Sequence, residues 1–415
     1  MTAEVTATER DALSLLTAAA VRSRARMMLD LGLRDGLAHF RIDLDRMDAV
    51  ADAVLATIRE NYPSLEIPFH ARWRHFAVDG VDRWGLLATP LSWPDRAARA
   101  RSEFDLAIVS VLLDAGAGAA WRYRDALSGR EIGRSEGLAL ASLDMFANGA
   151  FSARADDPLR VDADVIAGLT EASLAKGFQA TSANPLLGLD GRADLLRRLG
   201  KLITERTEVF GVEDTPRPGG LFDHLVAQAK DNAIEAPRIL SEVLHQLGPI
   251  WPSRLSLADV PLGDCWKHPA IKTDDATSGL VPLHKLSQWL TYSLIEPLQH
   301  AGLKVIDIDG LTGLAEYRNG GLFVDLGVLA LRDSADAARS HEVGSHLVVE
   351  WRALTVALLD QIAEIIRKRL GRTAQTLPLA SLLEGGTWAA GRAAAFERRA
   401  DGSPPIKVIS DGTVF

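Results

Sequence analysis

Apolar residues recur at helical spacing along most of this chain. The clearest stripe is Val50, Val54 and Ile58, which stand at positions i, i+4 and i+8 and would share one face of a helix. The same criterion, with glycine or proline near the ends of runs, predicts helices over residues 8–31, 45–61, 94–123, 164–177, 192–207, 221–247, 281–302 and 340–370.

The stretches between these runs carry turn residues and short β-branched segments. Residues 67–84 indicate loops or short strands, residues 128–157 are glycine-rich and polar, and the loop DTPRPGG at 214–220 is the clearest internal break. The tail PPIKVISDGTVF places a Ser-Asp-Gly turn between two β-branched runs, which predicts a C-terminal β-hairpin. We therefore expect a mainly α fold with small β additions.

The length of 415 residues allows two or three domains, or one large domain with insertions. We expect an N-terminal helical part over residues 1–135, which contains a basic and aromatic segment, and a main helical part over residues 136–415. One continuous domain is the alternative.

Composition and charge narrow the class of partner. The chain has 46 lysines and arginines against 55 aspartates and glutamates, so it repels a long polyanion such as nucleic acid unless its basic residues gather in one place. Cys265 is the only cysteine, which excludes an intrachain disulfide and suits a reducing compartment. The N-terminus lacks the basic start of a signal peptide, and no apolar run reaches the roughly 20 residues of a membrane span. We expect a cytoplasmic enzyme without a membrane or nucleic-acid partner, and its oligomeric state stays open.

Common catalytic motifs are absent from the sequence. HEVGSH places His341 and His346 five residues apart, whereas a helical zinc pair needs a spacing of four. Gly116 and Gly118 in DAGAG lack the third glycine of a dinucleotide-binding turn and follow a run that looks helical. No phosphate-binding Gly-x-x-x-x-Gly-Lys-Ser/Thr loop and no Gly-x-Ser-x-Gly elbow occurs. The sequence therefore predicts no metal and no cofactor.

One segment gathers positive charge in this acidic chain. His70, Arg72, Trp73 and Arg74 lie within HARWRH. Arginine forks suit phosphate oxygens, and an indole plane can stack on a base or a sugar. These four residues are therefore candidates for binding a phosphorylated substrate. The alternative is a surface segment whose arginines pair with the surplus acids.

Two further positions are candidates for substrate binding. Asp114 stands at a glycine-rich helix end, where it would either line a pocket or be solvated. Asp264 and His268 stand with Trp266 and Lys267 in the loop LGDCWKHP. Such a cluster can position a substrate, although loops are rich in these residue types in any case.

Residues 305–329, VIDIDGLTGLAEYRNGGLFVDLGVL, contain several carboxylates among apolar neighbours. Carboxylates in such surroundings are costly unless they are paired or used. Glycosidic cleavage needs a carboxylate beside the anomeric carbon, because the transition state carries oxocarbenium-like charge. The segment offers Tyr317 for the sugar, Arg318 for a phosphate or an acid, and the carboxylates of Asp307, Asp309, Glu316 and Asp325. The alternative is a loop with capping aspartates and helix-ending glycines.

A family resemblance rests on several long phrases that span nearly the whole chain. They are PFHARWRHF, FDLAIVSVLLDAGAGAAWRY, ANPLLGLDGRADLLRRLG, VPLHKLSQWLTYSLIEPL, LAEYRNGGLFVDLGVL, LLEGGTWAAG and SPPIKVISDGTVF. Together they resemble the uracil-catabolism family, the fourth component of the ring-opening pyrimidine pathway. The resemblance implies a cytoplasmic role in breaking down uracil by way of uridine monophosphate and a ribosylurea-type intermediate.

A second resemblance concerns the order Asp-x-Asp-x-Leu-Thr followed by an acid, a tyrosine and an arginine. Here it comprises Asp307, Asp309, Leu311, Thr312, Glu316, Tyr317 and Arg318. It is similar to a motif of the queuosine-salvage nucleosidases and implies their helical, DNA-glycosylase-like core. Glu316 stands where that family shows aspartate, and Asn319-Gly320-Gly321 replaces a Val-Pro-Gln sequence. The resemblance implies Glu316 as the catalytic carboxylate, with Asp309 as the alternative.

The resulting hypothesis is a hydrolase of the N-glycosidic bond in a phosphorylated ribosyl ureide or a related pyrimidine nucleotide. Glu316 would stabilise the cationic sugar or activate water, Trp73 would flank the leaving group, and the phosphate would be held by Arg72, Arg74 and Arg318. The rivals are a ureide amidohydrolase, a phosphoribosyl transferase and a non-catalytic scaffold of the same pathway. DNA-glycosylase activity has only fold analogy behind it, and the acidic charge opposes it.

Overall fold

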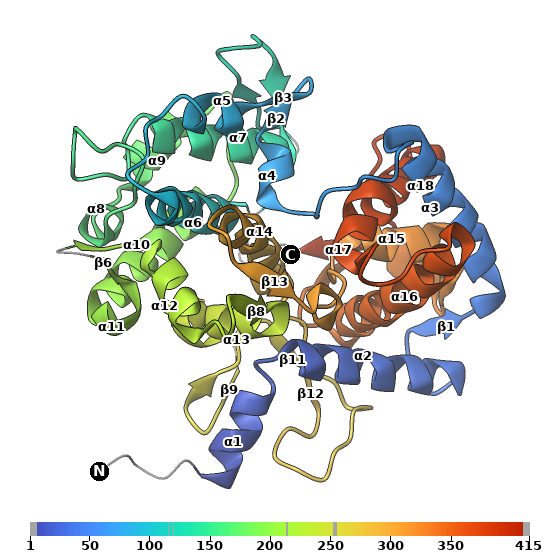
Figure 1. Cartoon of the computed structure of the whole chain (residues 1–415). Coiled ribbons are helices and arrows are strands. Elements are labelled where there is room, and N and C mark those ends of the chain that lie inside the picture. Colours follow the sequence, from blue (N-terminus) through green and yellow to red (C-terminus); the bar gives the residue numbers. More distant parts are fainter. Residues whose placement is uncertain (1–5, 115, 119, 213–214, 252–254, 410–415) are drawn as a thin grey trace. The chain divides into compact units, whose positions relative to one another are not determined.

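The computed structural model describes residues 6–114, 116–118, 120–212, 215–251 and 255–409 (Figure 1). Helices dominate these residues, and the strands are two or three residues long and pair two by two. The predicted mainly α fold with small β additions is confirmed. None of the helices in the described ranges has the length together with the apolar character that crossing a membrane demands.

The chain divides into two compact units, each made from separate stretches of sequence. The first unit comprises Met1–His70, Ser253–Gln288 and Asp307–Ser410, and the second comprises Ala71–Pro252, Trp289–Ile306 and Asp411–Phe415. The expected boundary after residue 135 lies inside the second unit, so the units follow packing rather than chain order. Helix α14, Lys285–His300, begins in the first unit and continues into the second.

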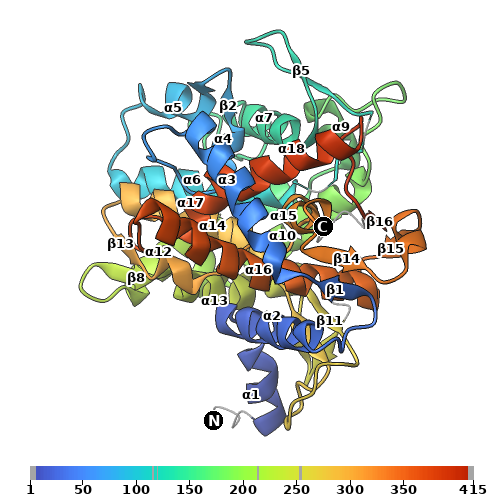
Figure 2. The ribbon, with the colours of Figure 1, turned by 90° about the vertical axis from the view of Figure 1, so that its right-hand side faces the viewer.

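The helices of the first unit are α1 Ala7–Ser14, α2 Ala18–Leu33, α3 Met47–Asn61, α15 Tyr317–Asp325, α16 His346–Leu370, α17 Leu379–Leu382 and α18 Trp388–Arg398. The unit adds the 3-10 turns η1 Leu44–Arg46, η3 Ile308–Gly310 and η4 Ser334–Ala337, and the π-helical segment η5 Leu383–Thr387. Every residue of α16 from Leu347 to Leu359 is buried, as expected of a helix covered on all sides. Helices α2, α3 and α15 pack on α16, and α18 packs on α15 (Figures 1 and 2).

Short strand pairs fasten the loops of this unit. They are β1 Phe40–Ile42 with β14 Leu329–Leu331, β9 Ser256–Leu257 with β10 Val260–Pro261, β11 Cys265–Lys267 with β12 Leu280–Pro282, and β15 Ser340–Glu342 with β16 Lys407–Ile409. The last pair is parallel. The first run of the expected C-terminal hairpin is therefore a strand that pairs with β15. The second run, residues 413–415, lies outside the described residues.

The second unit is centred on α6, Arg96–Leu112, which is buried without interruption from Ser102 to Leu112. Its other helices are α4 Arg72–His75, α5 Arg83–Ala88, α7 Arg134–Ala147, α8 Ala163–Ala167, α9 Glu171–Gly177, α10 Leu189–Glu205, α11 Thr207–Phe210, α12 Gly220–Gln228 and α13 Ala236–Leu247, with the 3-10 turn η2 Gly248–Ile250. Its strand pairs are β2 Ala77–Val78 with β3 Val81–Asp82, β4 Tyr123–Arg124 with β5 Glu131–Ile132, β6 Gly211–Val212 with β7 Thr215–Pro216, and β8 Ala233–Glu235 with β13 Lys304–Ile306. Helices α7, α10 and α12 pack on α6.

Three predicted helices are interrupted in the structure. The opening run is split because Thr17 caps a new helix, with its hydroxyl oxygen accepting the N–H of Ala20 at 3.1 Å. The run at 164–177 is split at Gly168 between α8 and α9, and the run at 221–247 is split by β8, which pairs with β13. Helix α7 falls in the region predicted to be glycine-rich and irregular.

Candidate active site

Glu316 is the N-cap residue of α15, with extended backbone. Its carboxylate folds back on the helix, so that Oε2 accepts the N–H of Arg318 at 2.7 Å and Oε1 accepts the N–H of Asn319 at 2.5 Å. These are two of the N–H groups that every helix leaves unsatisfied at its start. Serine, threonine, aspartate and asparagine are the usual caps, so a glutamate here is uncommon. The local sequence therefore fixes a carboxylate at the positive end of the α15 dipole.

The Glu316 carboxyl is buried, and only 8% of the residue is exposed. Burial raises its pKa above the ordinary value, although the two N–H groups and the electrostatic effects of Lys285 and His70 act in the opposite direction. Among the described residues its hydrogen bonds come from the backbone, and no arginine forms an ion pair with it. Buried carboxyls with raised pKa and no dedicated counter-ion are typical of catalytic sites.

His70 belongs to the surroundings of Glu316, as the electrostatic effect on its pKa shows. The His70 ring is buried, and its Nδ1 lies 2.7 Å from Oε2 of Glu384. Glu384 also accepts the hydroxyl of Tyr62 at 3.4 Å. It stands in η5, and single π-helical turns occur frequently at functional sites. The structure thus places His70 within electrostatic reach of Glu316, and substrate binding by His70 stays a prediction.

Asp264 supports the backbone in front of Glu316. Both oxygens of its carboxylate accept from the Arg352 guanidinium at 2.8 Å, and the Nε of Arg352 donates to the carbonyl of Ala315 at 3.1 Å. The backbone N–H of Lys285 adds a third bond to Asp264 at 3.0 Å. Arg352 holds the pKa of Asp264 at about 2 despite complete burial. Asp264 is therefore ionised at neutral pH and acts as a positioning residue.

Two other predicted carboxylates of the first unit are tied into structural contacts. Asp309 accepts from Arg367 at 2.5 Å and caps the N–H of Leu379 at 2.7 Å, so both carboxylate oxygens fasten η3 to α16 and α17. Asp325 makes a two-fold ion pair with Arg399 at 2.7 and 2.6 Å. The partners of Asp309 and Asp325 differ from the partners of Glu316. Asp309 as the alternative catalytic acid stays a prediction.

His268 and Arg318 are also buried and engaged. The Nε2 of His268 lies 3.2 Å from Glu350, whose carboxylate accepts backbone N–H groups at the start of the β1 segment. The Arg318 guanidinium lies over the ring of Tyr317, 4.9 Å from its centroid, and donates to the carbonyl of Gly402 at 2.7 Å. Arg318 therefore holds the chain near its C-terminal end, and phosphate binding by it stays a prediction.

The basic segment and Asp114 lie in the second unit. Arg72 is fully buried, donates to the hydroxyl of Ser110 at 2.7 Å and lies 3.1 Å from Asp114, so the structure brings these two predicted residues together. Burial lowers the pKa of Arg72, and Asp114 opposes this shift. Trp73 donates its indole N–H to the carbonyl of Ser293 at 2.7 Å.

Arg74 completes the predicted set and pairs with Glu296 at 2.6 Å, with both side chains partly exposed. The arginines of the basic segment thus pair with acids of this chain, as in the alternative interpretation of this segment. Phosphate binding by Arg72 and Arg74 stays a prediction.

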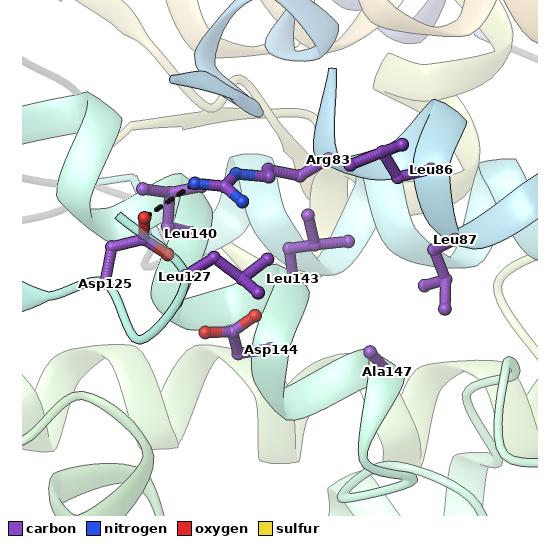
Figure 3. Close-up of a pocket in the computed structure, with 9 residues that line it drawn as sticks. All are labelled: Arg83, Leu86, Leu87, Asp125, Leu127, Leu140, Leu143, Asp144 and Ala147. Atoms are coloured by element: carbon purple, nitrogen blue, oxygen red, sulfur yellow. Dashed lines mark hydrogen bonds and ion pairs between the residues drawn. The ribbon is translucent and has the colours of Figure 1, made fainter. Parts of the chain in front are cut away.

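The second unit also contains an open pocket with a volume of about 260 Å³ (Figure 3). Its lining includes no residue that the sequence analysis singled out. Arg83 reaches across it to Asp125 at 2.7 Å, and Asp144 accepts the hydroxyl of Tyr123 at 2.5 Å. Its remaining lining is apolar and comprises Leu86, Leu87, Leu127, Leu140, Leu143 and Ala147. The Arg83 guanidinium and both carboxylates of this pocket thus have at least one partner each within the protein.

Sequence reasoning missed Lys285 and Glu384 near Glu316. Both stand in phrases that carry the family resemblance, VPLHKLSQWL and LLEGGTWAAG. The chemical signal was weak, because each is a single charged residue at the edge of an apolar run. The packing of η5 on α15 associates Glu384 with the Glu316 segment, and Lys285, at the start of α14, acts electrostatically on the pKa of Glu316.

Comparisons with known proteins identify one family over nearly the whole chain. Residues 14–415 match the family model described as "Protein of unknown function (DUF1688)". A relative from Schizosaccharomyces pombe, named "Protein urg3", is 39% identical over 412 residues, which cover 97% of this chain and 98% of that protein. A relative from Lachancea kluyveri, named "Uracil catabolism protein 4", is 38% identical over 409 residues, which cover 91% of this chain and 92% of that protein.

Proposed function

The chain belongs to the DUF1688 family, and from this premise we propose that it acts in uracil catabolism as a hydrolase of an N-glycosidic bond. The printed name of the Lachancea kluyveri relative supports the pathway. The observation that carries the chemistry is Glu316, a buried carboxyl with a raised pKa, which is fixed by backbone N–H groups and has no ion pair with an arginine guanidinium of the described residues.

The proposed substrate is a phosphorylated ribosyl ureide or a related pyrimidine nucleotide. Cleavage breaks the bond between the anomeric carbon and nitrogen, and water supplies a hydroxyl to the carbon and a proton to the nitrogen. The products are ribose 5-phosphate and urea or an acylurea. The anomeric carbon becomes cationic in the transition state, and a nearby carboxylate stabilises this charge or takes a proton from the attacking water.

The environment of Glu316 suits this role because a charge effect grows as water is excluded. Enzymes lower barriers by roughly 8 to 23 kcal/mol, so a carboxylate that acts on the developing cation has to supply a large share. The Ala315–Arg352–Asp264 connection limits movement of the Glu316 backbone. Such support keeps the carboxylate in place while the sugar changes shape.

Mass spectrometry of reactions with the purified full chain tests the proposal. The substrates are uridine monophosphate, its ring-opened products and ribosylurea 5-phosphate. We expect free ribose 5-phosphate from the wild type, and almost none from Glu316→Gln. Asp309→Asn tests the alternative acid of the same segment, because cleavage lost in Asp309→Asn and kept in Glu316→Gln would assign the catalytic role to Asp309.

Other products separate the rival functions. Ammonia without ribose 5-phosphate would identify an amidohydrolase, and turnover only with added pyrophosphate would identify a transferase. No turnover of any of these substrates would favour the scaffold. Cleavage that persists in Glu316→Gln would remove Glu316 from the mechanism and leave the reaction class standing.

A further inference from the structure

Asn319 carries an unusual unpaired group. The residue is fully buried, and neither the oxygen nor the nitrogen of its carboxamide has a hydrogen-bond partner among the residues that the structure describes. Burying an amide without partners costs about 1 to 3 kcal/mol by mutational measures, and folded proteins generally avoid it. The side chain therefore calls for a function beyond packing.

The position of Asn319 on α15 places its side chain inside the first unit. A Cβ on Gly391 of α18 would meet the carbonyl oxygen of Arg318, and a Cβ on Gly320 would meet Trp351 and Thr355 of α16. At about 100° per residue, Asn319 points between the side of α15 that faces α18 and the side that faces α16. It is also the residue whose N–H binds Oε1 of Glu316. The carboxamide and the carboxylate thus belong to one helical turn.

A second unpaired group lies on an element that α15 contacts. Thr387 ends η5, is fully buried, and its hydroxyl has no hydrogen-bond partner within the described part of the chain. Segment η5 packs against α15 and also carries Glu384, the partner of His70. The described part of the first unit therefore holds an unmatched carboxamide and an unmatched hydroxyl on two touching elements beside the candidate site.

We propose that Asn319, with Thr387, binds the ureido group of the substrate and so selects the leaving group of the reaction. The inference rests on the proposed function, which it deepens. A carboxamide presents one acceptor and a donor pair side by side. A ureido group, –NH–CO–NH₂, presents the complementary set, so the Asn319 oxygen accepts an N–H while its nitrogen donates to the carbonyl. The Thr387 hydroxyl forms a hydrogen bond with an atom of the ureido group that Asn319 does not contact.

The physical gain is selectivity. A site built to hydrogen-bond a polar group rejects an analogue that lacks it, because the buried groups are then left unpaired. A ureide fills both demands at once, whereas an apolar leaving group leaves the carboxamide as unmatched as it is in the free protein. Glu316 and Asn319 lie in one helical turn. The carboxylate that contacts the anomeric carbon and the carboxamide that binds the ureido leaving group therefore move together.

Two substrates that share the sugar phosphate test the inference. One is ribosylurea 5-phosphate, and the other is N-acetylribosylamine 5-phosphate, in which a methyl replaces the terminal amino group. Calorimetry with the full-length Glu316→Gln variant measures binding without cleavage. We expect the ureide to bind about 10- to 100-fold more tightly than the acetyl analogue, and Asn319→Leu in the same background to abolish this preference.

A thermal melt of the same proteins separates binding from structural support. Asn319→Leu removes an unpaired buried amide, so we expect its Tm to be unchanged or higher while the ureide preference is lost. Thr387→Val should reduce the preference by about 3- to 10-fold. Thr355→Val is the matched control, because its buried hydroxyl already donates to the carbonyl of Trp351 at 2.7 Å, and it should keep the full preference.

The outcomes distinguish this inference from the proposed function. Equal preference for the ureide in Asn319→Leu and its parent would overturn the inference and leave the hydrolase standing. A Tm that falls by many degrees in Asn319→Leu, with both ligands weakened alike, would also overturn it, because the side chain would then be structural. Loss of the preference in Asn319→Leu while wild-type protein cleaves neither compound would support ureide binding and overturn the hydrolase.

Discussion

Asp105 in the second unit and Glu316 in the first are buried carboxyl groups whose pKa values burial raises. Each accepts two backbone N–H groups, and those of Asp105 come from Val161 at 2.9 Å and Gly219 at 2.6 Å. They differ in one partner. Arg217 donates to Asp105 at 2.9 Å from its Nε and also from an Nη, whereas no arginine guanidinium of the described residues donates to Glu316.

The presence or absence of an arginine counter-charge distinguishes a structural buried carboxylate from one suited to catalysis. Asp105 joins α6 to the segments before α8 and α12, and its charge is matched inside the protein. A matched buried pair has little capacity left for a ligand. Glu316 keeps its charge unmatched by a guanidinium while its geometry is fixed by a helix start. It is therefore suited to stabilise a positive charge that appears only during a reaction.

Substitution at Glu316 should have the largest effect. We expect Glu316→Gln to reduce cleavage of ribosylurea 5-phosphate by about 10²- to 10⁴-fold, because the carboxylate either takes the proton of water or faces the cation. The free energy of unfolding should change by only about 1 kcal/mol, the usual value for a helix cap. Steady-state kinetics and urea unfolding measure the two effects. A large loss of stability would show that Glu316, like Asp105, is a structural carboxyl.

Asp105→Asn should show the opposite balance. We expect the free energy of unfolding to fall by about 3 to 5 kcal/mol, because Arg217 is left buried without its counter-charge. The protein that remains folded should keep its turnover per molecule. Urea unfolding tests the first point, and Asp105→Asn combined with Arg217→Met should recover part of the loss. A stable Asp105→Asn protein with impaired turnover would contradict the assignment of Asp105 to structure.

The pH dependence of stability should separate an arginine-matched carboxyl from an unmatched one. Arg352 holds the pKa of Asp264 at about 2, below the ordinary 3.8, so Asp264 contributes about 2 kcal/mol above pH 4 that is lost as the pH falls through that range. The pKa of Glu316 is raised, so its contribution is present below pH 4.5 and is lost as the pH rises through its folded value.

Unfolding free energies between about pH 3 and pH 8 check these signs against the neutral variants. The difference between wild type and Asp264→Asn should grow with pH, and the difference between wild type and Glu316→Gln should shrink. Turnover that needs the ionised Glu316 should rise with pH through the same raised value. The same slope for both variants would contradict the assignment.

The smallest effect concerns the partly exposed Arg74. Removing its ion pair with Glu296 in Arg74→Gln should cost less than about 1 kcal/mol of stability. If Arg74 also binds the substrate phosphate, KM should rise about 10-fold with kcat nearly unchanged. Arg369→Gln, which removes exposed pairs with Asp48 and Asp52, is the control and should leave KM unchanged. An unchanged KM in Arg74→Gln would assign this arginine to structure alone.

Strongly periodic stretches of the sequence predicted their elements well. The stripe of Val50, Val54 and Ile58 lies on α3, where all three residues are buried, and the long apolar run before Leu370 forms α16. Breaks within apolar runs were not visible, because a Thr17 cap or the pairing of β8 with β13 depends on partners elsewhere in the chain. Helix α7 was missed because Gly133 and Gly137 resemble the glycines of loops, although Gly137 lies within the helix and admits the close approach of the Ile132 carbonyl and the Trp121 ring.

The candidate site was predictable only in its charged residues. Glu316, Asp264 and His70 stood out as ionisable groups in apolar or aromatic surroundings. The unpaired state of Asn319 and Thr387 could not be predicted, because whether a polar atom finds a partner is decided by packing between α15 and η5. Likewise, no local pattern shows that Arg352 connects Asp264 to the residue before Glu316.

The interleaved origin of the two units sets an order for folding on the ribosome. All segments of the second unit up to Ile306 emerge before the stretch from Asp307 onward that holds α15, α16 and α18. The opening helices α2 and α3 have to wait for more than half of the chain to be synthesised before α16 can cover them. During that interval their apolar faces are exposed, so a chaperone that shields nascent chains would be expected to bind the first 70 residues.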